Sequence, residues 1–217
     1  MYRFFAQPQV DQARHRIFGY EVLLRQQKRH VWVLPASFTA ISVPDQARLL
    51  QQTATALNVA TTNQRLAFNL NRQQFQDPQT LTTIVKLKHQ LGTVPLVIEH
   101  TEAPKLSELI PFSATLHRAD IQLGLDDVGT GVNTYHNVKS LLPCVDEIKF
   151  AMQNFRAQHK PAAIQPELTF WTKVAREHHL EIILEGIETG QDQALAHHYG
   201  ITLHQGYLYG KPALVTA

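Results

Sequence analysis

The chain has 217 residues, of which 44% are hydrophobic, so it is long enough to bury one sizeable core, and we expect a single domain over residues 1–217. A net charge of +2, with basic residues spread along the chain, does not indicate a nucleic-acid or membrane partner. No stretch approaches the ~18 apolar residues of a membrane span or resembles a secretory signal, and we therefore expect a cytoplasmic protein. The single cysteine, Cys144, excludes an internal disulfide and is interpreted as a core residue.

Short apolar stretches alternate with helix-like segments along the chain. The expected strands cover residues 2–7, 17–24, 65–70, 94–99, 121–126, 145–150, 181–185 and 202–208. Helical spacing is clear over residues 45–57, whereas Pro161, Gln165 and Pro166 indicate a loop before a helix that begins near Glu167. This order predicts an α/β fold of the TIM type, a (β/α)8 barrel. A doubly wound open sheet is the alternative, but its glycine-rich phosphate turn after the first strand is missing.

The residues from Ile121 to Gly131 carry the clearest functional pattern. An apolar strand leads into two adjacent carboxylates, Asp126 and Asp127, and then into a Gly-Thr-Gly turn. Adjacent carboxylates repel each other unless a cation or a proton offsets their charge. The glycines let the backbone approach a phosphate-bearing ligand closely. The alternative interpretation is an ordinary polar turn, because Asp and Gly are common turn residues.

Other expected strands are also interrupted or ended by a polar residue. These residues are Glu21, Arg25, Asn69, Glu99, Lys149, Glu185 and Gln205. Most of them offer oxygen atoms, a hard set of donors that favours magnesium or manganese over zinc or copper. The adjacent histidine pairs His178-His179 and His197-His198 lack the separation with which two histidines of one helix share a metal ion, so we interpret them as solvent-facing.

Seven short segments, in order along the chain, resemble the motifs of the EAL-domain cyclic-di-GMP phosphodiesterases. They are Gln7-Pro8, Glu21-Val22-Leu23-Leu24-Arg25, Asn69, Glu99-His100-Thr101-Glu102, the loop from Asp126 to Gly131, Glu185-Gly186-Ile187-Glu188 and Gln205-Gly206-Tyr207. Each segment alone is a weak signal, but seven in the right order are a strong one. The resemblance covers essentially the whole chain and implies an EAL-type barrel.

The resemblance implies a catalytic site with two metal ions, Mg²⁺ or Mn²⁺. The implied ligands are Glu21, Asn69, Glu99, Asp126, Asp127 and Glu185, with Asp126 as a candidate bridge. In the family, water activated between the ions attacks one phosphodiester in line and opens cyclic di-GMP to linear pGpG. Cyclic di-GMP is therefore the expected partner, and a second copy of the chain or another protein is a further candidate. Because the first expected strand begins at the amino terminus, regulation is expected to act through a partner or through expression.

The resemblance also implies roles for individual side chains. Lys149, Glu185 and Asp127 are implied to be catalytic, with Lys149 steering the attacking water. Arg25 and Gln205 are implied to contact the substrate, the arginine through a charge-assisted bond to phosphate. Glu102 and Glu188 are implied to support the residues around the site, Glu102 by holding the loop that starts at Asp127.

Some positions depart from the family pattern. Ala151 stands where the family's Lys-Ile-Asp segment has its aspartate, and Val128 and Val132 replace two aromatic residues that help to order the loop and a nearby dimer contact. The stretch between Arg25 and Arg65 is also shorter than usual, which suggests a trimmed helix. Two functions stay open: a phosphodiesterase, or a weak or inactive domain that binds cyclic di-GMP or a protein partner as a regulator. An unrelated barrel phosphohydrolase acting on another diester is a third possibility.

Overall fold

The chain begins with a long antiparallel hairpin, seen in a computed structural model that describes residues 1–215. Its strands are β1 (Tyr2–Asp11) and β2 (Arg16–Lys28), which stay in register from Tyr2 opposite Gln26 to Asp11 opposite Arg16, with one irregularity at Gln9 and Val10. Alternate residues of β1, such as Phe4 and Ala6, are buried, as expected for a strand with one face on the core.

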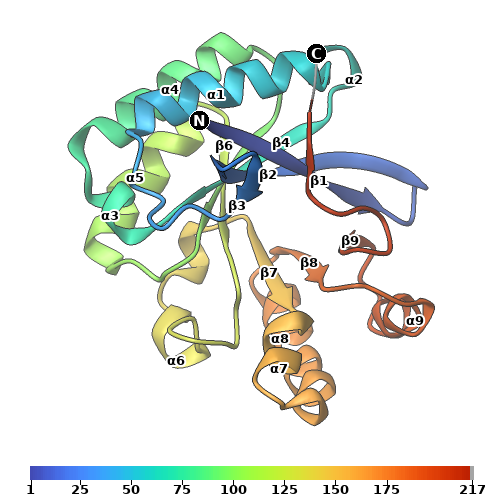
Figure 1. Cartoon of the computed structure of the whole chain (residues 1–217). Coiled ribbons are helices and arrows are strands. Elements are labelled where there is room, and N and C mark those ends of the chain that lie inside the picture. Colours follow the sequence, from blue (N-terminus) through green and yellow to red (C-terminus); the bar gives the residue numbers. More distant parts are fainter. Residues whose placement is uncertain (216–217) are drawn as a thin grey trace.

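The hairpin starts a closed barrel of eight strands (Figure 1). From β2 onward the neighbours run parallel, and they are β4 (Arg65–Leu70), β5 (Leu96–His100), β6 (Ile121–Leu125), β7 (Glu147–Ala151), β8 (Glu181–Glu185) and β9 (Leu203–Gln205). β9 then pairs antiparallel with β1 and closes the ring. This closure confirms the predicted TIM-like barrel and excludes the open sheet. Two short strands, β3 (Val31–Val33) and β10 (Ala213–Leu214), add to β2 and β1.

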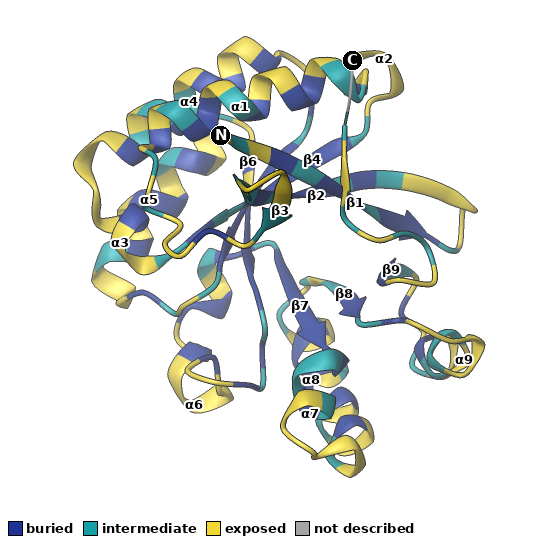
Figure 2. Cartoon of the chain, in the orientation of Figure 1, coloured by how far each residue is buried: buried dark blue, intermediate teal, exposed yellow. Residues whose placement is uncertain are grey.

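The helices surround the strands and turn their apolar faces inward, so that Figure 2 shows buried strands inside half-exposed helices. They are α1 (Val43–Ala56), α2 (Val59–Thr62), α3 (Arg72–Gln76), α4 (Pro78–Leu91), α5 (Leu106–Arg118), α6 (Tyr135–Val138), α7 (Met152–Ala157), α8 (Ile164–Glu177) and α9 (Gly190–His198). Side chains cap several of them; the Ser42 hydroxyl, for example, accepts from the Asp45 amide at the start of α1. Within residues 1–215, none of the helices is long and apolar enough to cross a membrane.

The predicted element boundaries differ from the structure at a few places. The predicted loop before Glu167 was wrong in part, because α8 already begins at Ile164 and holds Gln165 and Pro166 in its first turn. Proline is tolerated there because the first amides of a helix have no partner within the helix. Between Arg25 and Arg65 the chain forms one full helix, α1, and the single turn of α2.

The barrel interior holds a buried ion pair at the amino ends of its parallel strands. Arg65 donates to Glu147 at 2.6 and 3.3 Å, and the two side chains are 6% and 1% exposed. Gly19 faces Arg65 in the register of β2 and β4, and a Cβ added there would lie 2.3 Å from the Arg65 Cγ. The Phe18 ring lies 4.6 Å from the guanidinium, a cation–π contact. The missing side chain at Gly19 therefore provides the space that the arginine fills.

We expect Arg65→Met to lower the free energy of unfolding by about 3–5 kcal/mol, because it leaves the Glu147 carboxylate buried without its cation. The double variant Arg65→Met/Glu147→Leu removes both charges and should lose less than the single variant. Urea denaturation measures both. A double variant that is less stable than Arg65→Met alone would contradict this account of the pair.

Candidate active site

The polar residues predicted at strand ends meet at the opposite end of the barrel. Parallel strands present their carboxyl ends to the same face of a TIM-like barrel, where loops and strand ends together build a site. The contributions are Glu21 and Arg25 from β2, Asn69 from β4, Glu99 from β5, Asp126 and Asp127 after β6, Lys149 from β7, Glu185 from β8 and Gln205 from β9.

Lys149 lies at the centre of this group with its side chain 1% exposed. Its Nζ is 2.7 Å from Glu185, 3.0 Å from Glu99, 3.3 Å from Glu21 and 3.7 Å from Asp126. Burial by itself lowers the pKa of this lysine, but the surrounding carboxylates outweigh burial and raise the pKa well above its usual value. Lys149 is therefore charged, and it offsets part of the negative charge around it.

One lysine does not balance these carboxylates. Burial raises the pKa of Asp126 and of Glu185 to about 7, although Lys149 acts in the opposite direction. Burial likewise raises the pKa of Glu99 well above its usual value and raises that of Asp127. For Glu21, burial also acts to raise the pKa, but Lys149 and the amides of Gln205 and Asn69 lower it overall. The site thus holds negative charge that protons or additional cations must offset.

The carboxylates form two overlapping groups that suit cations. One comprises Glu21, Glu99 and Asp126 and the other Asp126, Asp127 and Glu185; within each, one oxygen per residue lies within 4.8 Å of the others. Asn69 Oδ1 and Glu99 Oε1 are buried and have no hydrogen-bond partner among residues 1–215. All these donors are oxygens, which suits a hard divalent ion such as magnesium, manganese or calcium. The residues therefore fit a pair of ions that share Asp126.

Two amides hold Glu21 in place. Asn69 Nδ2 donates to Glu21 Oε1 at 2.5 Å, which leaves Asn69 Oδ1 free for a cation. Gln205 Nε2 donates to Glu21 Oε2 at 2.5 Å and to Gln7 Oε1 at 3.2 Å. Gln205 is thus bonded to other side chains in this structure, and its contact with substrate stays a prediction.

The loop after β6 is held by two asparagines that the sequence analysis did not single out. Asn154 Nδ2 donates to Asp127 Oδ1 at 2.7 Å. Asn133, 1% exposed, donates to the carbonyls of Asp126 and Thr101 at 2.7 and 3.1 Å and accepts from the Ala103 amide at 2.9 Å. Asn133 therefore connects the loop after β6, which carries Asp126 and Asp127, to the segment after β5. An asparagine in a polar turn gives no sequence signal of such long-range bonds.

Glu102 and Glu188 are exposed, and within residues 1–215 neither side chain makes a hydrogen bond or ion pair. Asn133 makes the hydrogen bonds that hold the loop after β6, and the supporting roles of Glu102 and Glu188 stay predictions. Arg25 is half-buried, donates to the Leu24 carbonyl at 3.1 Å and lies beside Glu21, where it reaches both cavities of the site.

An aromatic residue from another part of the chain supports the loop. Gly129 has a φ of +86°, and an added Cβ would lie 2.7 Å from Nε1 of the fully buried Trp171 of α8. The loop therefore packs closely on Trp171, although Val128 and Val132 replace the aromatic residues expected within the loop itself.

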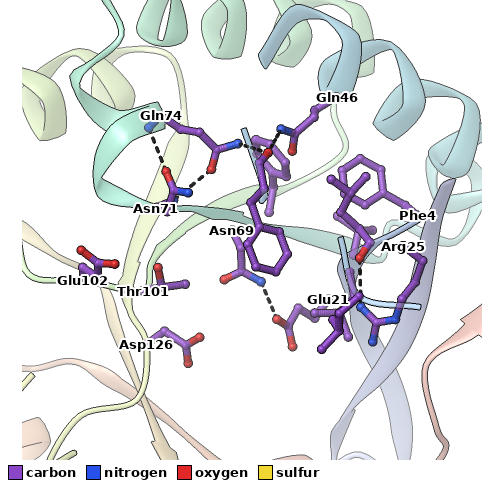
Figure 3. Close-up of a pocket in the computed structure, with 16 residues that line it drawn as sticks. Phe4, Glu21, Arg25, Gln46, Asn69, Asn71, Gln74, Thr101, Glu102 and Asp126 are labelled. Atoms are coloured by element: carbon purple, nitrogen blue, oxygen red, sulfur yellow. Dashed lines mark hydrogen bonds between the residues drawn. The ribbon is translucent and has the colours of Figure 1, made fainter. Parts of the chain in front are cut away.

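Two cavities meet at the carboxylates. The first, of about 390 Å³, has a largely apolar wall that includes Phe4, Leu24 and Phe68. Figure 3 shows Glu21, Asn69 and Asp126 at one side of it. The second, of about 340 Å³, is more polar and is lined by Asp127, Glu185, Gln205 and Tyr207 among others. Glu21, Arg25 and Asp126 border both, so one ligand could place an apolar ring and a charged group on the two sides of the carboxylates.

Ala151 ends β7 and is fully buried, opposite Glu185 in the register of β7 and β8. Because side chains alternate along a strand, Ala151 faces the same side as Lys149. The carboxylate expected there from the family pattern is replaced by a methyl group.

The histidine pairs and Cys144 lie apart from this site. His179, His197 and His198 are exposed, and His178 is half-buried. The potential metal-binding groups among residues 1–215 contain no histidine. Cys144 is partly buried and packs against the core, as predicted.

Comparisons with known proteins agree with this geometry. The model of the EAL domain matches residues 2–212. The probable cyclic di-GMP phosphodiesterase PdeD of Escherichia coli K12 is 25% identical over 97% of this chain, and the cyclic di-GMP phosphodiesterase PdeL of the same organism is 27% identical over 89%. This chain spans 41% of the length of PdeD and 58% of that of PdeL.

Solved structures share the fold. The EAL enzyme Bd1971 in its cAMP- and cyclic-di-GMP-bound form aligns with a TM-score of 0.82 and 19% identity, over 99% of this chain and 62% of that one. The manganese and cyclic-di-GMP complex of Klebsiella pneumoniae BlrP1 aligns with a TM-score of 0.75 and 22% identity, over 98% of this chain and 56% of that one. With a family model that matches nearly the whole sequence, this chain belongs to the EAL-domain family.

Proposed function

We propose that this protein is a metal-dependent phosphodiesterase that opens cyclic di-GMP to linear pGpG in bacterial second-messenger signalling. The observation that carries the proposal is the pair of buried carboxylate groups that share Asp126 around Lys149. The names of PdeD and PdeL, which belong to cyclic di-GMP phosphodiesterases, support the same substrate.

In this proposal Glu21, Asn69, Glu99, Asp126, Asp127 and Glu185 hold two divalent cations, magnesium or manganese. When bound, such ions make water more acidic and offset charge on a phosphodiester. The protein supplies the orientation: Asn69 and Gln205 fix Glu21, while Asn154 fixes Asp127.

The other side chains bind and steer the substrate. Lys149, already charged, donates N–H groups to the attacking water and to the negative charge that develops on the phosphate. Asp127 and Glu185 orient that water and accept its proton. Arg25 binds a phosphate oxygen at the border of the two cavities. The apolar cavity beside Glu21 takes a purine ring.

A second candidate function is a receptor that binds cyclic di-GMP with little or no hydrolysis and regulates a protein partner or a second copy of the chain. Its supporting observation is Ala151, a buried methyl group on the face of β7 that carries Lys149. We favour the enzyme because a disused metal site loses ligands freely, and here the implied ligands are all present and gathered at one end of the barrel.

Hydrolysis of cyclic di-GMP by the purified protein with Mn²⁺ tests the proposal. We expect pGpG as the product, and Glu99→Gln should lower the rate by more than about a hundredfold, because it removes a charged donor from the site. Chromatography of the products measures both. Glu177→Gln, a change of an exposed glutamate on α8, should leave the rate unchanged. Equal rates for Glu99→Gln and the parent would refute the site, and tight binding without hydrolysis would establish the receptor.

Ala151→Asp restores a carboxylate beside Lys149. With Mn²⁺ bound, we expect the rate of hydrolysis to rise about tenfold to a hundredfold, because a hydrogen bond that involves a charged group is worth on the order of 1.5–3 kcal/mol. Single-turnover rates of the two proteins give the comparison, and Ala194→Asp, at an exposed position of α9, is the control for added charge. A rate that falls or does not change would show that the missing carboxylate at position 151 does not limit hydrolysis.

A further inference from the structure

A line of buried polar side chains connects the two charged ends of the barrel interior. Glu147 pairs with Arg65, and Arg65 Nε donates to Gln9 Oε1 at 3.0 Å. Gln9 Nε2 donates to Gln205 Oε1 at 2.9 Å, and Gln205 donates to Glu21. Gln9, at the middle of the line, is 0% exposed. The ion pair at the amino ends of the strands is thus linked to a carboxylate of the candidate active site.

Strand register brings Gln9 to this position. On β1 it lies opposite Gln205 of β9 and opposite Gly19 of β2. Because Gly19 has no side chain, Arg65 reaches across to Gln9. The antiparallel strand β1 is therefore what joins the two ends of the barrel interior.

The positive charge of Arg65 fixes the direction of every hydrogen bond in this line. A guanidinium can only donate, so Gln9 must turn its oxygen to Arg65 and its NH₂ group to Gln205. Gln205 then accepts through its oxygen, and its own NH₂ group must face Glu21 and Gln7. The opposite orientation of Gln205 would place an amide oxygen against the carboxylate of Glu21.

We propose that Gln9 is a positioning residue for the active site: it holds the Gln205 amide so that its N–H groups face Glu21 and keep that carboxylate aligned for a cation. This inference rests on the proposed function and adds a residue that touches neither the carboxylates nor the cavities. Without Gln9, the Gln205 amide can rotate, and Glu21 loses its fixed place opposite Asn69.

Gln9→Met keeps the length of the side chain and removes both hydrogen bonds. We expect it to change the side-chain amide signals of Gln205 in ¹⁵N NMR spectra of the metal-free protein. We also expect it to weaken Mn²⁺ binding about tenfold, as measured by isothermal titration. This is the low end of the loss seen when a residue that hydrogen-bonds to a metal ligand, without touching the metal, is replaced. Gln9→Glu keeps the acceptor for Arg65 but places a second acceptor, with a negative charge, against the Gln205 oxygen, so it should have the same two effects while the bond to Arg65 is retained.

Two comparisons separate positioning from a general loss of stability. Gln193→Met is the matched control, because Gln193 also loses two hydrogen bonds, to Gln12 and Tyr209, but has no link to Glu21. In a Gln205→Met background, Gln9→Met should weaken Mn²⁺ binding no further, because its effect passes through Gln205.

Additive effects in the double variant would overturn the inference, as would unchanged Gln205 signals in both Gln9 variants. If the parent binds no Mn²⁺, the proposed function fails, and the Gln205 signals alone then decide the inference.

Discussion

The balance of charge around Lys149 is the constraint on which the rest of this structure depends. A single ammonium lies within 4 Å of oxygens from Glu21, Glu99, Asp126 and Glu185, with Asp127 beside them, and all of these groups are shielded from water to a large degree. Charges buried in this way are costly unless they are paired or bound to metal. The closed barrel holds them together, because they come from five different strands or strand ends, with Asp126 and Asp127 both after β6, and the neighbouring strands fix the position of each strand.

Amide side chains around the carboxylates fix the orientation of the carboxylate oxygen atoms. Asn69 and Gln205 hold Glu21, Asn154 holds Asp127, and Asn133 anchors the backbone of Asp126. Preorganisation of this kind is what a cation site requires, since displaced ligands cost affinity. The ion pair of Arg65 and Glu147, at the other end of the barrel, is connected to Gln205 through hydrogen bonds of Gln9.

Much of this arrangement could be predicted from the sequence, because it depends on local patterns. Apolar runs that end in one polar residue located the eight barrel strands and the residues that gather at Lys149. The missed features depend on contacts between distant segments. Gln9 is a single amide whose partners lie 56 and 196 residues away, and Asn133 reaches Thr101 and Ala103, 32 and 30 residues away. Arg65 is the first residue of a strand, and nothing in its local sequence indicates a pairing with Glu147. The start of α8 was missed because the sequence signal of Pro166 does not distinguish a loop from a first helical turn.

The measurement that tests the charge balance most directly is proton release on Mn²⁺ binding, obtained by calorimetry in buffers of different ionisation enthalpy. The pKa of Asp126 and of Glu185 is raised to about 7, so the metal-free protein holds protons on these groups at pH 6 and loses them as the pH rises through 7. Because a metal ion binds the deprotonated carboxylates, we predict the release of about one proton or more per protein at pH 6, less release at pH 8.5, and an affinity that increases between these values. Binding without proton release at pH 6, or an affinity that decreases as the pH rises, would contradict the account.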